Sequence, residues 1–146
     1  NRKPLNRQVT DELEDTYWES LDQMLARMDV ISVNCPHTPA TFHLLNARRI
    51  DLLKPDAFVV NTARGEVIDE AALARALKAG RIGGAGLDVF EDEPHVPAGL
   101  MALDRVTLLP HVGSASVHTR DAMGQLVVDN LTSWFETGKA VTPVPG

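Results

Sequence analysis

The chain has 146 residues, of which 44% are hydrophobic and 23% are charged, and its formal net charge is −6 at neutral pH. This composition is ordinary for a globular protein, and the negative charge argues against a nucleic-acid-binding surface. The single cysteine, Cys35, excludes an internal disulfide and fits a reducing compartment, and no stretch reaches the roughly 20 apolar residues of a membrane span.

Four short apolar runs have the composition of strands that are buried in a parallel sheet. These runs span residues 30–34, 57–61, 84–89 and 106–109. We expect a strand at each of them.

Amphipathic segments before and between the first three runs predict helices. Ser20, Asn46 and Asp69 are expected to be the N-caps of these helices. The helices are expected at residues 21–28, 47–53 and 70–79, the last being closed by Gly80.

One long helix is expected after the fourth strand, ending at Gly138. Apolar side chains recur there at spacings of three and four residues, in a stripe wider than an exposed helix carries. The stripe contains Met123, Leu126, Val127, Leu131, Trp134 and Phe135. This helix either packs on the same sheet or belongs with another domain.

The alternation of strands and helices with short connections predicts an α/β fold. Such connections are right-handed crossovers between parallel strands, so we expect a doubly wound, Rossmann-like sheet.

Three motifs place polar side chains just after predicted strands. These motifs are NTARG at residues 61–65, EP at residues 93–94 and PHVG at residues 110–113. Ligands bind at the carboxyl ends of strands in open α/β sheets, so Arg64, Glu93 and His111 are expected to share one pocket.

The three residue types fit the chemistry of a dehydrogenase. The planar guanidinium of Arg64 can hold a carboxylate through two parallel hydrogen bonds. The imidazole of His111 can give a proton to a carbonyl oxygen as a hydride arrives, or remove one in the reverse direction. The carboxylate of Glu93, bonded to the far ring nitrogen, would fix the tautomer and favour the imidazolium.

Long stretches of the chain resemble the D-isomer-specific 2-hydroxyacid dehydrogenases, and within that family the glyoxylate/hydroxypyruvate reductases. The resemblance covers roughly residues 20 to 137. It rests on MDVISVNCPHTPAT from residue 28, LKPDAFVVNTARG from residue 53, GAGLDVFEDEP from residue 84 and LPHVG from residue 109.

The resemblance implies that Arg64 anchors the substrate carboxylate, that His111 is the acid/base and that Glu93 is its partner. It also implies a longer enzyme, because family members are about twice this length and their Gly-x-Gly-x-x-Gly loop has no counterpart here. Residues 1–113 are then the carboxyl-terminal part of the dinucleotide-binding domain, and residues 114–146 are a helix and tail associated with a missing substrate domain. On this reading the fold is incomplete, and the chain alone is expected to be inactive.

The resemblance also suggests the coenzyme and its contacts. NAD-preferring members carry an acidic side chain where this chain has Asn1 and Arg2, so NADP(H) is expected and NAD is the alternative. Asp88 matches the position that bonds the nicotinamide carboxamide. The full predicted set of cofactor contacts is Asn1, Arg2, Cys35, Pro36, Thr41, Thr62, Ala63, Asp88, His111 and Gly113. We predict no metal site.

Alternative functions remain open at this point. A formate dehydrogenase would carry Gln where this chain has Glu93, so that function is disfavoured. Phosphoglycerate and D-lactate dehydrogenases share all the residues above. Co-repressors with this fold, and a non-catalytic nucleotide-sensing or interaction fragment, are alternatives of a different class.

The partners expected are a small 2-oxo or 2-hydroxy acid and, for the full-length enzyme, a second copy of the same chain. We expect no nucleic-acid or membrane partner and a cytoplasmic location.

Overall fold

The computed structural model describes residues 6–144 of the chain. These residues divide into two compact units, one reaching to His111 and the other starting at Val112. We describe each unit by itself.

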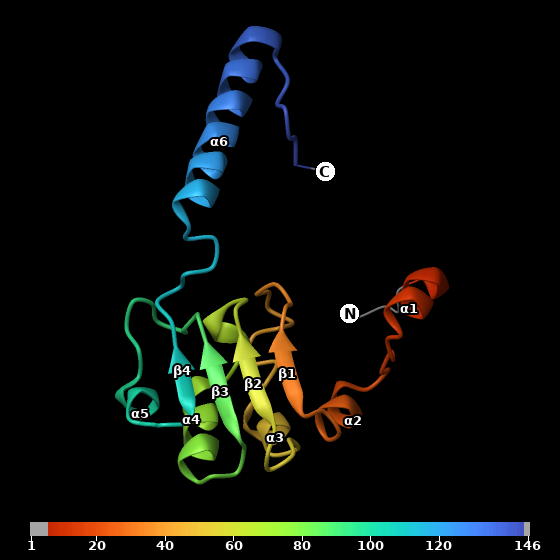
Figure 1. Cartoon of the computed structure of the whole chain (residues 1–146), viewed down its shortest axis with the longest axis vertical. Coiled ribbons are helices and arrows are strands. Elements are labelled where there is room, and N and C mark those ends of the chain that lie inside the picture. The colour runs from red at the N-terminus through yellow and green to blue at the C-terminus, as the bar shows by residue number, and fades with distance from the viewer. Residues whose placement is uncertain (1–5, 145–146) are drawn as a thin grey trace. The chain divides into compact units, whose positions relative to one another are not determined.

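The first unit is built on a four-stranded parallel sheet in the order β1-β2-β3-β4 (Figure 1). All four predicted strands are present, each slightly shorter than expected, and they confirm the α/β, Rossmann-like fold. The strands are β1 (Val30–Val33), β2 (Phe58–Asn61), β3 (Gly84–Leu87) and β4 (Val106–Leu108). Because all are parallel, their carboxyl ends lie at one edge of the sheet.

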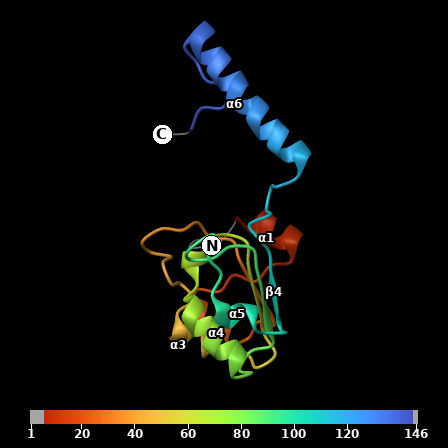
Figure 2. The same cartoon turned by 90° about the vertical axis from the view of Figure 1, so that its left-hand side faces the viewer.

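One face of the sheet carries the core. Ile31, Val59 and Ala85 are in register on neighbouring strands, and all three are buried. They cluster with apolar residues of α3 (Ala47–Ile50) and α4 (Glu70–Lys78), and Figure 2 shows both helices on the same side of the sheet.

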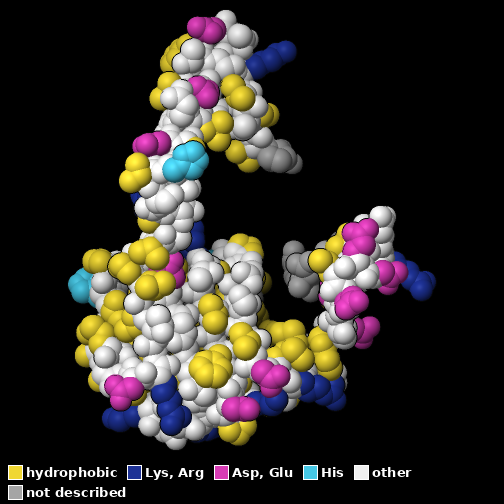
Figure 3. All heavy atoms as spheres, in the orientation of Figure 1, with side chains coloured by type: hydrophobic (Ala, Val, Ile, Leu, Met, Phe, Trp, Pro, Cys, Tyr) yellow, Lys and Arg dark blue, Asp and Glu magenta, His cyan; other side chains and the backbone are white. Residues whose placement is uncertain are grey.

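The opposite face of the sheet is open. Its residues Val30 and Phe58 are paired in register and exposed, and Figure 3 shows hydrophobic side chains over the side of this unit that faces the viewer. Helices α3 and α4 therefore cover one face of a sheet type that is normally covered on both (Figure 2).

The three predicted N-caps are confirmed. Asp69, for example, accepts a hydrogen bond from the backbone N–H of Ala72 at 2.8 Å. Ser20 and Asn46 do the same for α2 (Leu21–Leu25) and for α3.

Two of these helices are shorter than predicted. α2 ends at Leu25 and α3 ends at Ile50. Beyond each end the chain tightens: the N–H of Arg27 bonds to the carbonyl of Met24, and the N–H of Leu53 bonds to that of Ile50. Such hydrogen bonds to the third residue back are typical of a helix terminus.

Three short elements were not predicted. They are α1 (Arg7–Leu13), the 3₁₀ turn η1 (Gly65–Val67) and α5 (Ala98–Met101). The first has a visible signal, because the Asn6 side chain accepts a hydrogen bond from the N–H of Val9 at 2.9 Å. α5 has no side-chain cap.

The second unit is dominated by α6 (Val117–Thr137), which confirms the predicted long helix (Figure 1). Ser116 caps its start, and Gly138 ends it at a φ of 72°, in the left-handed region that favours glycine. No residue of α6 is buried, and its large apolar side chains are exposed. None of the helices within residues 6–144 is long and apolar enough to cross a membrane.

Candidate active site

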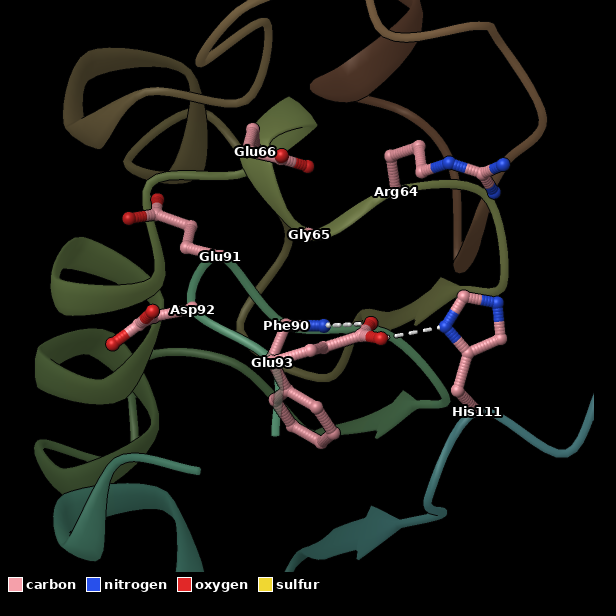
Figure 4. A pocket seen from close by; sticks show the side chains of 8 residues that line it. All are labelled: Arg64, Gly65, Glu66, Phe90, Glu91, Asp92, Glu93 and His111. Carbon is pink, nitrogen blue, oxygen red and sulfur yellow. Dashed lines mark hydrogen bonds and ion pairs between the residues drawn. The ribbon is translucent and has the colours of Figure 1, made fainter. Parts of the chain in front are cut away.

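Arg64, Glu93 and His111 lie together at the carboxyl edge of the sheet, in the segments that follow β2, β3 and β4. All three line one pocket of about 340 Å³. Figure 4 shows Arg64 and His111 on one side of this pocket and the carboxylates of Glu66, Glu91 and Asp92 on the other. The complete lining is Arg64, Gly65, Glu66, Phe90, Glu91, Asp92, Glu93 and His111.

Glu93 is hydrogen-bonded to His111, with 2.7 Å between its Oε2 and the ring Nδ1 (Figure 4). Its other oxygen, Oε1, accepts a hydrogen bond from the backbone N–H of Phe90 at 3.1 Å. The bond to His111 is the main reason that the pKa of Glu93 lies below its usual range. The carboxylate is therefore anionic at neutral pH, the state that stabilises a protonated imidazole.

Arg64 starts from a turn that is fixed by its neighbours. Its Nη1 donates a hydrogen bond to the carbonyl of Ala63 at 2.6 Å. The next residue, Gly65, packs so tightly that an added Cβ would lie 1.9 Å from the carbonyl carbon of Phe90. The turn after β2 is therefore in close contact with the loop that carries Glu93.

A second histidine–carboxylate pair, which we did not predict from the sequence, uses a carboxylate of the same loop. His43 Nε2 is 2.7 Å from Glu91 Oε1, and the ring of Phe42 stacks on His43 with centroids 4.0 Å apart. Glu91 and Glu70 also bond to each other: the Glu91 N–H donates to Glu70 Oε1 at 2.8 Å, and the Glu70 N–H donates to Glu91 Oε1 at 3.3 Å.

Glu70 is a nearly buried carboxylate, 8% exposed, at the start of α4. Burial raises its pKa above the usual range, and the nearby carboxylates of Glu91, Glu66 and Glu93 add to this effect. Glu70 thus joins α4 to the loop of residues 90–93.

A second pocket, of about 630 Å³, lies where β1 and β2 end. It contains Cys35, Pro36, Thr62 and Ala63, which were predicted to line a nucleotide, and it shares Arg64 with the first pocket. Its full lining is Asn34, Cys35, Pro36, His37, Thr62, Ala63 and Arg64. Strand-end backbone and small side chains beside the Arg64 pocket fit a flat, partly polar ring such as nicotinamide.

The other predicted cofactor contacts lie elsewhere. Asp88 follows β3 and is 5% exposed. The Thr41 hydroxyl closes its own loop, since it donates to the carbonyl of Pro36 at 2.6 Å and accepts from the N–H of Thr38 at 2.8 Å. Gly113 belongs to the second unit.

Asn1 and Arg2 lie outside the described residues. Within the described part of the chain, no group of three or more His, Cys, Asp or Glu side chains is arranged to hold a metal ion.

A family model described as "D-isomer specific 2-hydroxyacid dehydrogenase, NAD binding domain" matches residues 1–113. Among curated proteins, the chain is 48% identical over 129 residues to hydroxyphenylpyruvate reductase of Plectranthus scutellarioides, covering 88% of this chain and 41% of that protein. It is 42% identical over 144 residues to glyoxylate/hydroxypyruvate reductase A of Arabidopsis thaliana, covering 97% of this chain and 46% of that protein.

Solved structures give the same picture. The NADPH-dependent glyoxylate/hydroxypyruvate reductase of Sinorhizobium meliloti, in complex with NADP and malonate, matches with a TM-score of 0.90 and 48% identity, covering 99% of this chain and 44% of that one. The D-mandelate dehydrogenase of Rhodotorula graminis matches with a TM-score of 0.91 and 34% identity, covering 100% and 43%. The chain thus spans less than half the length of each of these relatives.

Proposed function

Because this chain belongs to the D-isomer specific 2-hydroxyacid dehydrogenase family, we propose that the enzyme containing it transfers a hydride between NAD(P)H and a small 2-oxo acid such as glyoxylate or hydroxypyruvate. The observation that carries the proposal is the 2.7 Å hydrogen bond between Glu93 and His111, at a pocket that Arg64 also lines. The names of reductases that are similar to this chain support the substrate class.

His111 acts as the acid/base. Glu93 binds Nδ1, so Nε2 is the ring nitrogen that exchanges a proton with the substrate oxygen. In reduction, the imidazolium gives its proton to the carbonyl oxygen as that oxygen gains charge, and in oxidation the neutral ring removes the hydroxyl proton. Glu93 holds the ring in the required tautomer and stabilises its charged form.

Arg64 holds the substrate carboxylate. A guanidinium offers two parallel N–H donors, which fix both the position and the rotation of a 2-oxo acid. Its present bond to the Ala63 carbonyl uses Nη1, and a carboxylate is a stronger acceptor than this neutral carbonyl. Substrate binding therefore turns the side chain away from its own backbone.

The coenzyme is held by the pocket at the ends of β1 and β2, with Cys35, Pro36, Thr62 and Ala63 along it. Asp88 bonds the carboxamide, and Thr41, His111 and Gly113 complete the described contacts. When bound, NAD(P)H supplies the hydride. Asn1 and Arg2 favour NADPH, and the NADPH dependence of the S. meliloti relative supports this preference.

The proposal extends to the organisation of the enzyme. Residues 1–113 form part of its nucleotide domain, and residues 114–146 associate with its substrate domain. The enzyme is a cytoplasmic homodimer without a nucleic-acid partner. The single cysteine supports the cytoplasmic location, and the net charge of −6 supports the absence of a nucleic-acid partner. Sedimentation of the full-length enzyme tests the dimer.

Steady-state reduction of glyoxylate, hydroxypyruvate, 3-phosphohydroxypyruvate and pyruvate, each with NADPH and with NADH, tests the function. We expect the highest kcat/KM for one of the first two acids with NADPH. A preference for NADH would contradict the coenzyme assignment alone. Highest kcat/KM for the phosphorylated acid or for pyruvate would favour a phosphoglycerate or D-lactate dehydrogenase, and nucleotide binding without turnover would favour a sensing role.

A further inference from the structure

Asn61, the last residue of β2, is a buried polar side chain to which the proposed mechanism gives no role. It is 1% exposed and lies in register with the apolar residues Val33 and Leu87. An amide placed among apolar neighbours is costly unless its donor and acceptor are both used. The partners of this amide therefore indicate why an asparagine is present.

Both ends of the amide bond to the turn that follows β2. Oδ1 accepts a hydrogen bond from the backbone N–H of Ala63 at 3.0 Å, and Nδ2 donates one to the backbone carbonyl of Arg64 at 2.9 Å. The Oδ1 bond to the residue two positions on is the pattern of an Asx-turn. The backbone carbonyl of Asn61 meanwhile accepts from the N–H of Asp88 at 3.0 Å, which extends the pairing of β2 with the segment after β3.

The Arg64 side chain projects from the turn that Asn61 holds in this way. Its guanidinium bonds to the Ala63 carbonyl at 2.6 Å. On the other side, Gly65 is in close contact with the Phe90 backbone. The backbone at Arg64 is therefore fixed from two directions, by the buried amide of Asn61 and by the loop that leads to Glu93.

We propose that Asn61 is the positioning residue for Arg64, setting the direction from which the guanidinium reaches the substrate carboxylate. This inference rests on the proposed role of Arg64 as carboxylate anchor. Asn61 touches no substrate and acts through Arg64. Loss of its amide leaves the charge in place and removes the orientation that a two-donor contact requires.

A double-mutant cycle in the full-length enzyme tests the inference, with Asn61→Ala, Arg64→Ala and both changes together. Misplacing a binding group by about 1 Å can cost on the order of 100-fold in rate. We expect Asn61→Ala to lower kcat/KM for hydroxypyruvate by about 10-fold to 100-fold, mostly through KM, and to leave the KM for NADPH unchanged. In the Arg64→Ala enzyme the same change should have little further effect, because residues that act through one contact are not additive.

Asn46→Ala is the matched control. Asn46 is also an asparagine whose Oδ1 accepts a backbone hydrogen bond, from Arg49 at 3.1 Å, but it caps α3 and lines neither pocket. We expect Asn46→Ala and Asn61→Ala both to lower the melting temperature. Only Asn61→Ala should change the KM for hydroxypyruvate.

Calorimetric titration with malonate, in the presence of NADP, gives a readout without turnover. We expect Asn61→Ala and Arg64→Ala each to weaken malonate binding, and the double variant to resemble Arg64→Ala alone. Equal losses from Asn61→Ala in both backgrounds, or unchanged malonate binding in Asn61→Ala, would overturn the inference. Absence of 2-oxo acid reduction by the unmodified enzyme would instead overturn the proposed function.

Discussion

Two histidine–glutamate hydrogen bonds involve the loop of residues 90–93, and they invite comparison because they join the same two kinds of side chain. In one, His111 Nδ1 is 2.7 Å from Glu93; in the other, His43 Nε2 is 2.7 Å from Glu91. Both histidines have positive φ values, 54° and 47°. Neither distance nor backbone conformation separates the pairs.

The ring nitrogen that each carboxylate binds separates them. In His111 the nitrogen nearer the backbone, Nδ1, is bonded to Glu93, which leaves Nε2 for the substrate that we propose. In His43 the outer nitrogen is bonded, the ring is stacked on Phe42, and the same Glu91 oxygen also accepts the N–H of Glu70. The His111 side chain is 46% exposed and that of His43 is 29% exposed. Under the proposed function, we expect the first pair to exchange a proton with the substrate and the second to hold the loop in place.

Replacing each histidine with asparagine should give the largest difference between the two pairs. His111→Asn should lower kcat for hydroxypyruvate by about 10²–10⁴-fold, the usual contribution of general acid–base catalysis. His43→Asn should leave kcat little changed and cost about 1 kcal/mol or less of stability, as partly exposed ion pairs do. Steady-state kinetics and thermal melting check both. A larger kcat loss in His43→Asn would mean that the roles are reversed.

Neutralising Glu93 and Glu91 in turn should change the pH dependence of the rate differently. Because the pKa of Glu93 is lowered by His111, Glu93 is anionic over the working range and favours the protonated ring that reduction requires. Glu93→Gln removes that charge, so reduction should be lost at a lower pH than in the unmodified enzyme. Glu91→Gln should leave the alkaline limb of the pH–rate profile in place. Equal displacement by both changes would show a general field effect in the pocket.

The smallest expected effect is on thermal stability and comes from Glu70, the residue that bonds to Glu91 of the second pair. The pKa of Glu70 is raised above its ordinary 4.5 by burial and by neighbouring carboxylates. A carboxyl with a raised folded-state pKa is most favourable while protonated, so its contribution is lost as pH rises from about 4.5 through the raised value. Glu70→Gln keeps an acceptor for the Glu91 N–H and should raise the melting temperature at neutral pH.

The gain from Glu70→Gln should vanish near pH 4, where Glu70 itself is protonated. Melting curves from pH 4 to 8 for the two proteins provide the measurement. Parallel curves over that whole range would show that ionised Glu70 carries no stability cost. Asp69→Ala is a suitable comparison, because it removes the adjacent N-cap bond and should destabilise at every pH.

Local sequence signals predicted most of the fold. Each strand was visible as an apolar run, and Ser20, Asn46 and Asp69 each stand at a helix start because the cap bond spans only three residues. The helix ends were less predictable, since the tightening after Leu25 and Ile50 carries no marker residue. α5 was missed for a related reason: no side chain caps it.

The site was predictable as far as its residues follow strands. Arg64, Glu93 and His111 were found together because parallel strands bring their ends to one edge. The His43–Glu91 pair was not, because it joins positions 48 residues apart in loops whose path no local pattern specifies. Asn61 is part of the NTARG motif, yet the hydrogen bonds of its side-chain amide become visible only in the folded turn. All the predicted cofactor contacts stay predictions, and those at Asn1 and Arg2 also lie outside the described residues.

The close contact between Gly65 and Phe90 limits how the proposed substrate site can be redesigned. A mutant library for new substrates would naturally diversify the residues around Arg64. At position 65, however, every side chain meets backbone atoms about 2 Å away that no rotamer change can move aside. Most clones changed there would lose the shared geometry of Arg64 and Glu93 before selection could act on specificity. The side chain of Glu66 lines the pocket and is about one-third exposed. Variation at Glu66 would change the shape of the pocket while keeping the contact between Gly65 and Phe90.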